Sequence, residues 1–170
     1  MNTVRRAFDR TDTILTRAMA RFGLSLLRWS VGLVFLWFGI LKFFPGLSPA
    51  QELAAKTISL LTFDLVPPST SIWILALWET LIGVGLLFNL FMRGTLLLLF
   101  LQMLGTITPL FLFPAEAFTR IPYAPTLEGQ YIIKNLVLIS AGIVMGATVR
   151  GGGLVSEPGG QRQPPNRPAC

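Results

Sequence analysis

The sequence predicts an all-α polytopic membrane protein, a bundle of four transmembrane helices with a short extracytoplasmic amphipathic helix. Two observations lead to this prediction. Only 13% of the 170 residues are charged, whereas a soluble domain usually carries about 25%. Apolar segments of 20 to 22 residues also recur along the chain, over 23–44, 71–92, 94–113 and 129–149. Each is long enough to cross a hydrocarbon core of about 30 Å as a helix, which satisfies its own backbone hydrogen bonds.

The first 22 residues form an amphipathic segment that we expect to lie on the cytoplasmic side. Its apolar residues recur at spacings of three, four or seven, with arginines between them: Val4, Phe8, Leu15, Ala18 and Phe22. This pattern suits a helix on an anionic leaflet, and a solvated basic leader is the alternative. The apolar run that follows is longer than the apolar region of a signal peptide, which has about 7–15 residues. We therefore expect the first span to be retained.

A short helix is expected in the first outer loop, over 45–70. Ser48 suits the N-cap, and Pro49 and Gln51 follow it at the positions of a first helical residue and of a capping box. One face of this helix is apolar and consists of Leu53, Ile58 and Leu61. The pair Pro67–Pro68 is expected to end the helix, which either covers the outer mouth of the bundle or packs at the membrane interface.

The remaining connections are short or rich in proline and glycine. A turn around Arg93 and Gly94 predicts that the second and third spans form an antiparallel hairpin. The second outer loop, 114–126, contains three prolines and is expected to be irregular. The transmembrane domain is therefore predicted over 23–150, and the Gly/Pro-rich tail over 151–170 is predicted to be disordered.

The distribution of basic residues predicts the orientation in the membrane. The side that holds both termini and the turn between spans two and three carries ten of them: Arg5, Arg6, Arg10, Arg17, Arg21, Arg28, Arg93, Arg150, Arg162 and Arg167. The other side carries three, namely Lys42, Lys56 and Arg120. We therefore expect a multi-pass membrane protein with both termini in the cytoplasm.

Composition also excludes several classes of function. The chain has no histidine, and its only cysteine is Cys170. Intrachain disulfides, CxxC redox chemistry, cysteine-based zinc sites and histidine-ligated haem are therefore excluded, and we expect no intrinsic cofactor and no metal site. The formal charge of +6 comes from basic residues that flank apolar runs, which indicates a lipid bilayer as partner rather than a nucleic acid.

Several polar residues lie inside the spans. Counted from the predicted outer ends of their helices, Lys134 lies about 7 Å deep and Glu79 about 12 Å deep. Gln102 lies eleven residues from the outer end of its span, and Lys42 lies just below the outer surface. We therefore expect a polar cluster in the outer half of the membrane.

The energetics of burial favour pairing within this cluster. An unpaired ionised side chain deep in a membrane costs at least about 2.5–3.5 kcal/mol, so Glu79 is expected to face Lys134, Lys42 or both. Lys134 either meets Glu79 or extends outward toward water, and Lys42 is near enough to the surface to do the latter. Gln102 and Asn135 are expected to fill the remaining hydrogen-bond positions.

Two interpretations of the cluster stay open. The residues either form a buried pair that sets the helix register, or line a polar pocket that opens outward and binds a small polar group or relays protons. In the second interpretation Glu79 is the candidate proton-relay residue. The candidate binding residues are Lys42, Glu79, Gln102, Lys134 and Asn135.

Three of the spans resemble those of the DoxX-like membrane proteins. RWSVGLVFLWFGILKFFPG is similar to their first span, LWETLIGVGLLFN to their second and LEGQYIIKNLVLISAG to their fourth. The resemblance extends to a related inner-membrane family associated with reactive chlorine resistance and covers 24–150. It places Arg28, Lys42, Glu79 and the pair Lys134–Asn135 at matching positions. The chain differs from the chlorine-resistance relatives in its shorter first outer loop and its lack of a cysteine pair.

The resemblance implies a small four-helix protein of the bacterial inner membrane. Some members are linked to thiosulfate:quinone oxidoreduction and others to oxidative-stress complexes. We therefore expect a membrane subunit of a redox or oxidative-stress system, linked to quinone, whose partner protein carries the electron-transfer cofactor. A small-solute transporter or binding protein, acting as a homo-oligomer, is one alternative. A structural or assembly protein without catalysis is the other.

Overall fold

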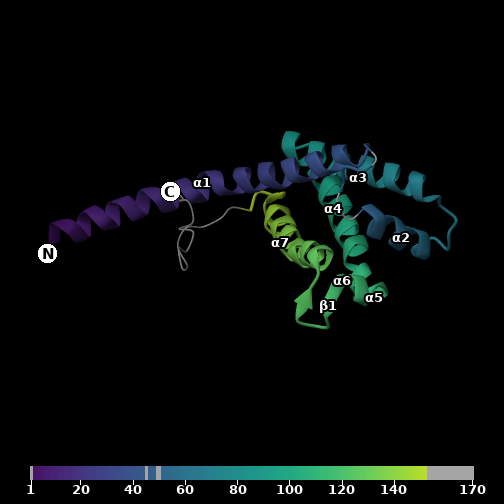
Figure 1. Ribbon diagram of the computed structural model, residues 1–170. Coiled ribbons are helices and arrows are strands. Elements are labelled where there is room, and N and C mark those ends of the chain that lie inside the picture. The colour runs from purple at the N-terminus through teal and green to yellow at the C-terminus, as the bar shows by residue number, and fades with distance from the viewer. Residues whose placement is uncertain (1, 45, 49–50, 153–170) are drawn as a thin grey trace, which may run out of the picture.

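The computed structural model describes residues 2–44, 46–48 and 51–152. Helices dominate this part of the chain, and one small antiparallel hairpin interrupts them (Figure 1). In chain order the elements are α1 (Asn2–Leu41), α2 (Gln51–Leu61), α3 (Pro68–Phe88), α4 (Met92–Ile107), α5 (Pro109–Leu112), α6 (Pro114–Ala117), β1 (Phe118–Arg120), β2 (Ala124–Pro125) and α7 (Leu127–Thr148).

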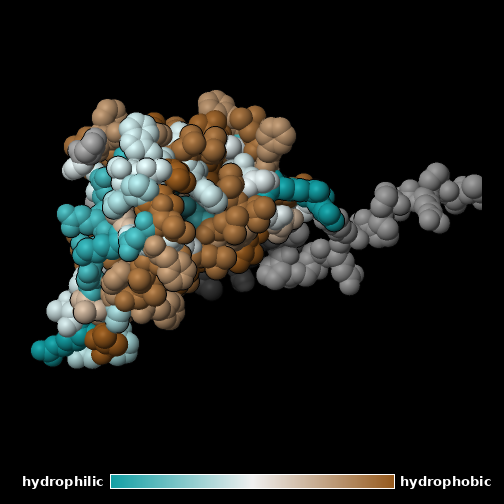
Figure 2. All heavy atoms as spheres, turned by 90° about the vertical axis from the view of Figure 1, so that its right-hand side faces the viewer, coloured by the Kyte–Doolittle hydropathy of each residue, from teal (hydrophilic) through white to brown (hydrophobic). Residues whose placement is uncertain are grey.

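Four helical segments of the described chain are long and apolar enough to cross a membrane. They are Phe8–Leu41, Pro68–Phe88, Met92–Leu112 and Leu127–Thr148. Figure 2 shows one face of the molecule, where hydrophobic residues cover most of the surface and hydrophilic ones gather toward its edges. Exposed apolar surface on this scale requires lipid around it. The prediction of an all-α polytopic bundle is confirmed: the chain is a multi-pass membrane protein whose helices contact the bilayer.

Helices α1 and α3 pack antiparallel and so closely that glycine is needed between them. A Cβ atom on Gly39 would lie 2.7 Å from the backbone nitrogen of Thr80. A Cβ atom on Gly83 would lie 2.5 Å from the backbone nitrogen of Leu36. Small residues that let two backbones approach are a common device of membrane helix pairs. These contacts also set the stagger of the pair: Gly39, near the end of α1, lies beside the middle of α3.

The second helix pair, α4 and α7, crosses below the first in Figure 1. Gly142 of α7 faces α4, where an added Cβ would lie 3.1 Å from the ring of Phe100. Gly142 and Gly146 form a GxxxG sequence in α7. It contacts α4 through Gly142, whereas Gly146 is less crowded. Side chains from all four long helices meet between the two pairs in one apolar core: Val31, Phe35, Ile82, Leu86, Leu96, Leu99, Met103, Ala141 and Met145.

The bundle has two ends, which we name by their contents. The arginine end is where α3 ends, α4 begins and α7 ends, and Arg93 and Arg150 lie there. The loop end holds α2, α6 and the β1–β2 hairpin. At the arginine end, α3 and α4 form the predicted hairpin, but its turn comes earlier than Arg93. Asn89 and Phe91 adopt the left-handed conformation at φ 57° and 42°, so Arg93 already lies in α4.

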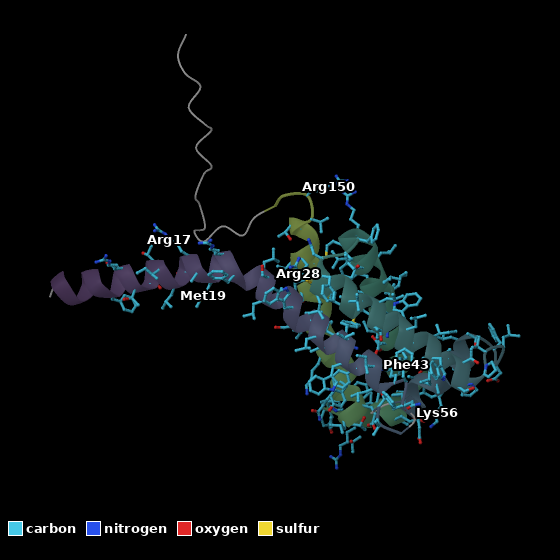
Figure 3. The ribbon with its side chains drawn as sticks, turned by 90° about the horizontal axis from the view of Figure 1, so that it is seen from above. Arg17, Met19, Arg28, Phe43, Lys56 and Arg150 are labelled. Atoms are coloured by element: carbon cyan, nitrogen blue, oxygen red, sulfur yellow. The ribbon has the colours of Figure 1, made fainter. Side chains whose placement is uncertain are left out.

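Helix α1 runs without a break across the predicted boundary at residue 22. The sequence offers no proline there, and Gly23 alone does not end the helix. The amphipathic segment is therefore an extension of the first span that projects beyond the rest of the bundle (Figure 1). Arg17 and Met19 point to opposite sides of it (Figure 3). The predicted disordered tail, 151–170, lies outside the described residues except for Gly151 and Gly152.

Helix α2 at the loop end confirms the short helix predicted between the first two spans, but it ends earlier than expected. Its last residue is Leu61 rather than a residue next to Pro67. Phe63 and Asp64 adopt the left-handed conformation and turn the chain, and the Ser59 hydroxyl donates a hydrogen bond to the Asp64 carboxylate. Of the predicted apolar face, Leu53 is buried, whereas Leu61 is half exposed. The helix packs against α3 and α5.

The second outer loop is more regular than its prolines suggested. The prediction of an irregular segment over 114–126 is wrong, because α6 and the β1–β2 hairpin lie there. Pro114 opens α6 at a position where helices do not need the backbone N–H group that proline lacks. Thr126 then caps α7 by accepting a hydrogen bond from the Gly129 amide at 3.1 Å. Lys56 of α2 contacts Glu116 of α6 at 3.1 Å across the loop end.

Candidate functional site

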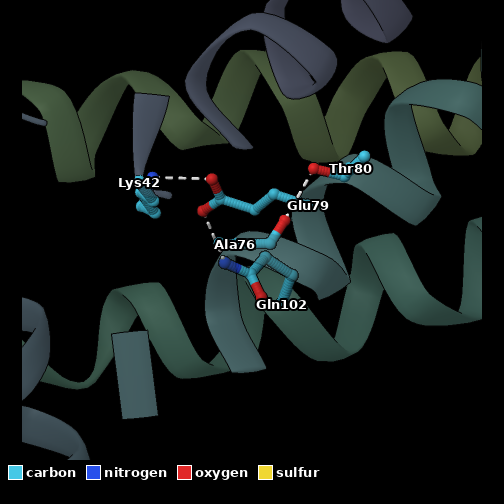
Figure 4. A network of polar contacts seen from close by, with 5 residues as sticks. All are labelled: Lys42, Ala76, Glu79, Thr80 and Gln102. Carbon is cyan, nitrogen blue, oxygen red and sulfur yellow. Dashed lines mark hydrogen bonds and ion pairs between the residues drawn. The ribbon is translucent and has the colours of Figure 1, made fainter. Parts of the chain in front are cut away.

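A polar network joins three of the four long helices inside the bundle (Figure 4). Glu79 projects from α3, and its Oε2 accepts a hydrogen bond from the Lys42 ammonium group at 2.6 Å. Its Oε1 accepts a second hydrogen bond from the Gln102 amide of α4 at 3.0 Å. Only 10% of the Glu79 side chain and 11% of the Lys42 side chain are exposed. Each carboxylate oxygen therefore has one donor, and the ion pair is largely shielded.

The close packing of α1 on α3 creates this network. Lys42 follows the last residue of α1, and its backbone N–H continues the helical turn by donating to the Gly39 carbonyl at 3.2 Å. Because Gly39 lies directly against Thr80, the lysine side chain emerges beside Glu79. Thr80 keeps its own hydroxyl occupied by donating to the Ala76 carbonyl at 2.7 Å (Figure 4).

Glu79 lies deeper along its helix than the sequence suggested, whereas Gln102 lies close to its expected place. Helix α3 begins at Pro68, so Glu79 lies eleven residues from its start and nine from its end. Gln102 is likewise ten residues from either end of the Met92–Leu112 segment. Glu79 is deeper than expected because α3 starts at Pro68 rather than at Ser71. That both residues lie in the outer half of the membrane stays a prediction. Glu79 and Gln102 lie midway along their spans, roughly 15 Å from each end.

Lys134 does not take part in the network. Its side chain is exposed, and its ammonium group lies 5.6 Å from the centroid of the Tyr131 ring. Of the two lysines expected to face Glu79, Lys42 does so and Lys134 does not. The other option for Lys134, a side chain that extends outward, agrees with its exposure.

Asn135 forms a second polar contact one helical turn from the network. Its side-chain amide donates to the Thr106 hydroxyl of α4 at 3.1 Å. Thr106 is four residues after Gln102 and so lies on the same face of α4. The spacing of Gln102 and Thr106 can be read from the sequence, but nothing in the sequence indicates that Asn135 contacts Thr106. Gln102 thus fills a hydrogen-bond position of Glu79 as predicted, whereas Asn135 does not and instead joins α7 to α4 through Thr106. Together the network and this separate contact connect all four spans.

Aromatic side chains lie next to the network without closing it off. The Trp78 indole donates a hydrogen bond to the Leu98 carbonyl of α4 at 3.1 Å, which anchors it between the helices. Phe43 and Trp73 stack edge to face with their ring centroids 5.1 Å apart. Trp73 is 59% exposed, so this aromatic pair faces the surroundings close to Lys42 in the chain.

The arrangement can hold and move protons, but its residues offer no site for electron storage. Lys42 uses one of its three N–H donors on Glu79, which leaves two for another acceptor. A carboxylate and an ammonium group in direct contact can exchange a proton when either gains a new partner. Within the described ranges no three His, Cys, Asp or Glu residues gather as metal ligands.

The sequence was then compared with known proteins. A family model described as DoxX matches residues 23–115, which is more than half of the chain. The chain belongs to the DoxX family. The matched part contains Lys42, Glu79 and Gln102, so the whole three-helix network lies inside it. The comparisons with curated proteins and with solved structures gave no match.

Proposed function

We propose that this DoxX-family protein is a membrane subunit of a redox or oxidative-stress system, linked to the quinone pool. The network of Lys42, Glu79 and Gln102 is the observation that supports it. A satisfied ion pair midway through a membrane is costly to place there and often marks a proton or substrate pathway. Membership of the DoxX family agrees with a redox context.

The residues of the network fit a quinone headgroup. A quinone has two carbonyl oxygens that accept hydrogen bonds, and it takes up two electrons and two protons when it is reduced. Lys42 has two further N–H donors, and the exposed Trp73 ring offers an apolar face near the same helix end. Glu79 is proposed to relay both protons in turn: its carboxylate takes up a proton from water, passes it to an oxygen of the reduced quinone and is ionised again, while Lys42 balances the carboxylate charge. The electrons would come from a partner protein that carries its own redox cofactor.

The proposed location is the bacterial inner membrane with both termini in the cytoplasm. The ten-to-three bias of basic residues toward the arginine end and the termini supports this orientation. Under it, the loop end faces the periplasm. A homo-oligomer is compatible with the large apolar surface.

The first experiment is purification in mild detergent with identification of every retained protein and extracted small molecule. Retained quinone, or a partner with flavin or metal, is expected and supplies an assay.

Glu79→Gln should then lower quinone reduction by about 10²-fold or more, because it removes the proton-carrying carboxyl group but keeps the shape of the side chain. Lys134→Gln is the matched control, since it removes an intramembrane charge outside the network.

Two outcomes would contradict the proposal. A protein that retains neither quinone nor redox partner removes the redox role, and flux measurements in vesicles would then test transport. Unchanged quinone reduction in Glu79→Gln removes the proton role and leaves the network as a device that holds the helices in register.

A further inference from the structure

A cavity of about 400 Å³ lies at the arginine end of the bundle, remote from Glu79. Four polar side chains contribute to its wall: Ser25, Arg28, Asn89 and Thr148. Met92 and Met145 supply apolar wall beside them. The cavity is thus bounded by α1, the α3–α4 turn, α4 and α7. Pockets of roughly 300–1,000 Å³ are the usual size for small ligands.

Arg28 is the charged residue among those that line this cavity, and no described residue is its partner. Its Nε atom is buried, yet within the described residues it makes no hydrogen bond. A buried donor of a charged group without a partner costs about 1–3 kcal/mol or more. Arginine in a membrane span is normally paired for this reason. Figure 3 shows Arg28 beside the other helices of the bundle, whereas Arg17 on the same helix points away.

The surroundings of Arg28 favour an anion as the missing partner. Among the described residues that line the cavity there is no carboxylate. The nearest acidic residue before Arg28 in α1 is Asp12, sixteen residues away, or about 24 Å along the helix. Asn89 is exposed, and its side-chain amide bonds no other described residue, so this group is available as a second donor. A planar guanidinium with an adjacent amide is well suited to phosphate oxygens.

A second hollow next to the cavity indicates which kind of molecule would supply the phosphate group. It has a volume of about 330 Å³ and shares Val149 with the first. Arg93 and Arg150 lie on it, and the rest of its wall is largely apolar, with Leu97 and Phe100 of α4. An acyl chain would fit against such a wall while the phosphate stays near the arginines. Basic pockets between membrane helices are known sites for anionic headgroups.

We propose that the Arg28 cavity binds a phosphate group, and that an anionic phospholipid of the surrounding leaflet supplies it. Arg28 and Asn89 hold the phosphate oxygens, and the hollow between α4 and α7 takes part of an acyl chain. The bound lipid would connect α1 to the α3–α4 turn and α7 at the end of the bundle where no protein ion pair does so among the described residues. This site is independent of the network around Glu79.

The test uses the full-length protein in nanodiscs, with bound lipid counted by native mass spectrometry. In discs of phosphatidylcholine with a minor share of phosphatidylglycerol, the wild-type protein should retain phosphatidylglycerol. Arg28→Gln should weaken that retention about tenfold or more, as expected for one charge-assisted hydrogen bond. Arg28→Lys should weaken it less because the charge stays. Arg17→Gln is the matched control and should behave as wild type.

Two further arms separate the possible sources and guard against misfolding. Inorganic phosphate is titrated into pure phosphatidylcholine discs, and binding there without retention of phosphatidylglycerol would overturn the lipid as the source. Ser25→Leu fills the cavity without changing any charge, and it should reduce phosphatidylglycerol retention while elution and helix content stay normal. Equal retention by wild type, Arg28→Gln and Ser25→Leu would overturn the proposal.

Discussion

At the scale of single residues, the ion pair between Lys42 and Glu79 dominates the interior. A buried pair is seldom a large source of stability, because desolvation of both charges offsets their attraction. Removing one partner is a different matter, since the other charge then stays buried alone. The network should therefore be far more sensitive to single substitutions than to a matched double substitution.

Lys42→Met should lower the free energy of unfolding in detergent by about 3–5 kcal/mol, because it leaves the Glu79 carboxylate without its cation. The double variant Lys42→Met/Glu79→Leu should recover most of the loss. Lys134→Met is the matched control and should change stability by less than about 0.5 kcal/mol. Denaturant unfolding followed by helix content provides the measurement, and a larger effect from Lys134→Met would contradict the assigned pairing.

The choice of Lys42 over Lys134 shows where the sequence stops being informative. Composition and spacing indicate that Glu79 needs a cation, and depth along the helices makes both lysines acceptable. The decision depends on the stagger between α1 and α3, which follows from the contact of Gly39 with the Thr80 backbone. Such a tertiary contact cannot be derived from the periodicity of either helix alone.

At the scale of elements, the α1–α3 pair is the most closely packed part of the bundle. Three glycines lie in this contact, namely Gly32, Gly39 and Gly83, and an added Cβ would be most crowded at Gly83. Inside a bilayer the hydrophobic effect does not drive helices together, so close van der Waals packing has to supply the free energy of association. The position of Lys42 beside Glu79 depends on the same contact.

Gly83→Ala should destabilise the protein by about 1–3 kcal/mol through overpacking against Leu36. Gly105→Ala is the matched control, because Gly105 has nothing within 4 Å of an added Cβ. It should be neutral or slightly stabilising, since alanine favours helix more than glycine does. Thermal unfolding of the two variants in the same detergent compares them directly, and equal melting temperatures would contradict the packing described.

The long helices were predictable, but their ends and the loop end were less so. A run of about 20 apolar residues has few alternatives to a membrane helix, and all four spans are where the sequence indicated. α1 nevertheless continues through residue 22, because amphipathic and apolar segments are equally compatible with helix. The β1–β2 hairpin escaped prediction because prolines signal a break in helix without specifying what replaces it.

At the scale of the whole molecule, both ends of the described chain leave the bundle at the arginine end. Four spans return the chain to the side on which it started, and the turn between α3 and α4 lies on that same side. The proposed orientation therefore places Arg93 and Arg150 together on the cytoplasmic side and the β1–β2 hairpin on the other.

Single cysteines can test this orientation, because Cys170→Ser removes the only native thiol. In intact cells a membrane-impermeant maleimide should label Tyr123→Cys, which lies in the exposed hairpin. It should label Arg150→Cys only after permeabilisation. Labelling in the opposite order would place the arginine end outside and overturn the proposed topology.

The ion pair also joins two helices that the ribosome delivers at different times. Lys42 lies at the margin of the first span, where its flexible stem can keep the ammonium group near water until a partner arrives. Glu79 lies midway along the next span, where its short side chain does not reach the water outside the membrane. Synthesis therefore supplies the cation before the carboxylate that requires it, and we expect α1 to assist the entry of α3 into the bilayer. In a translocon insertion assay, α3 should insert less efficiently alone than behind α1, and Lys42→Met should remove much of that advantage.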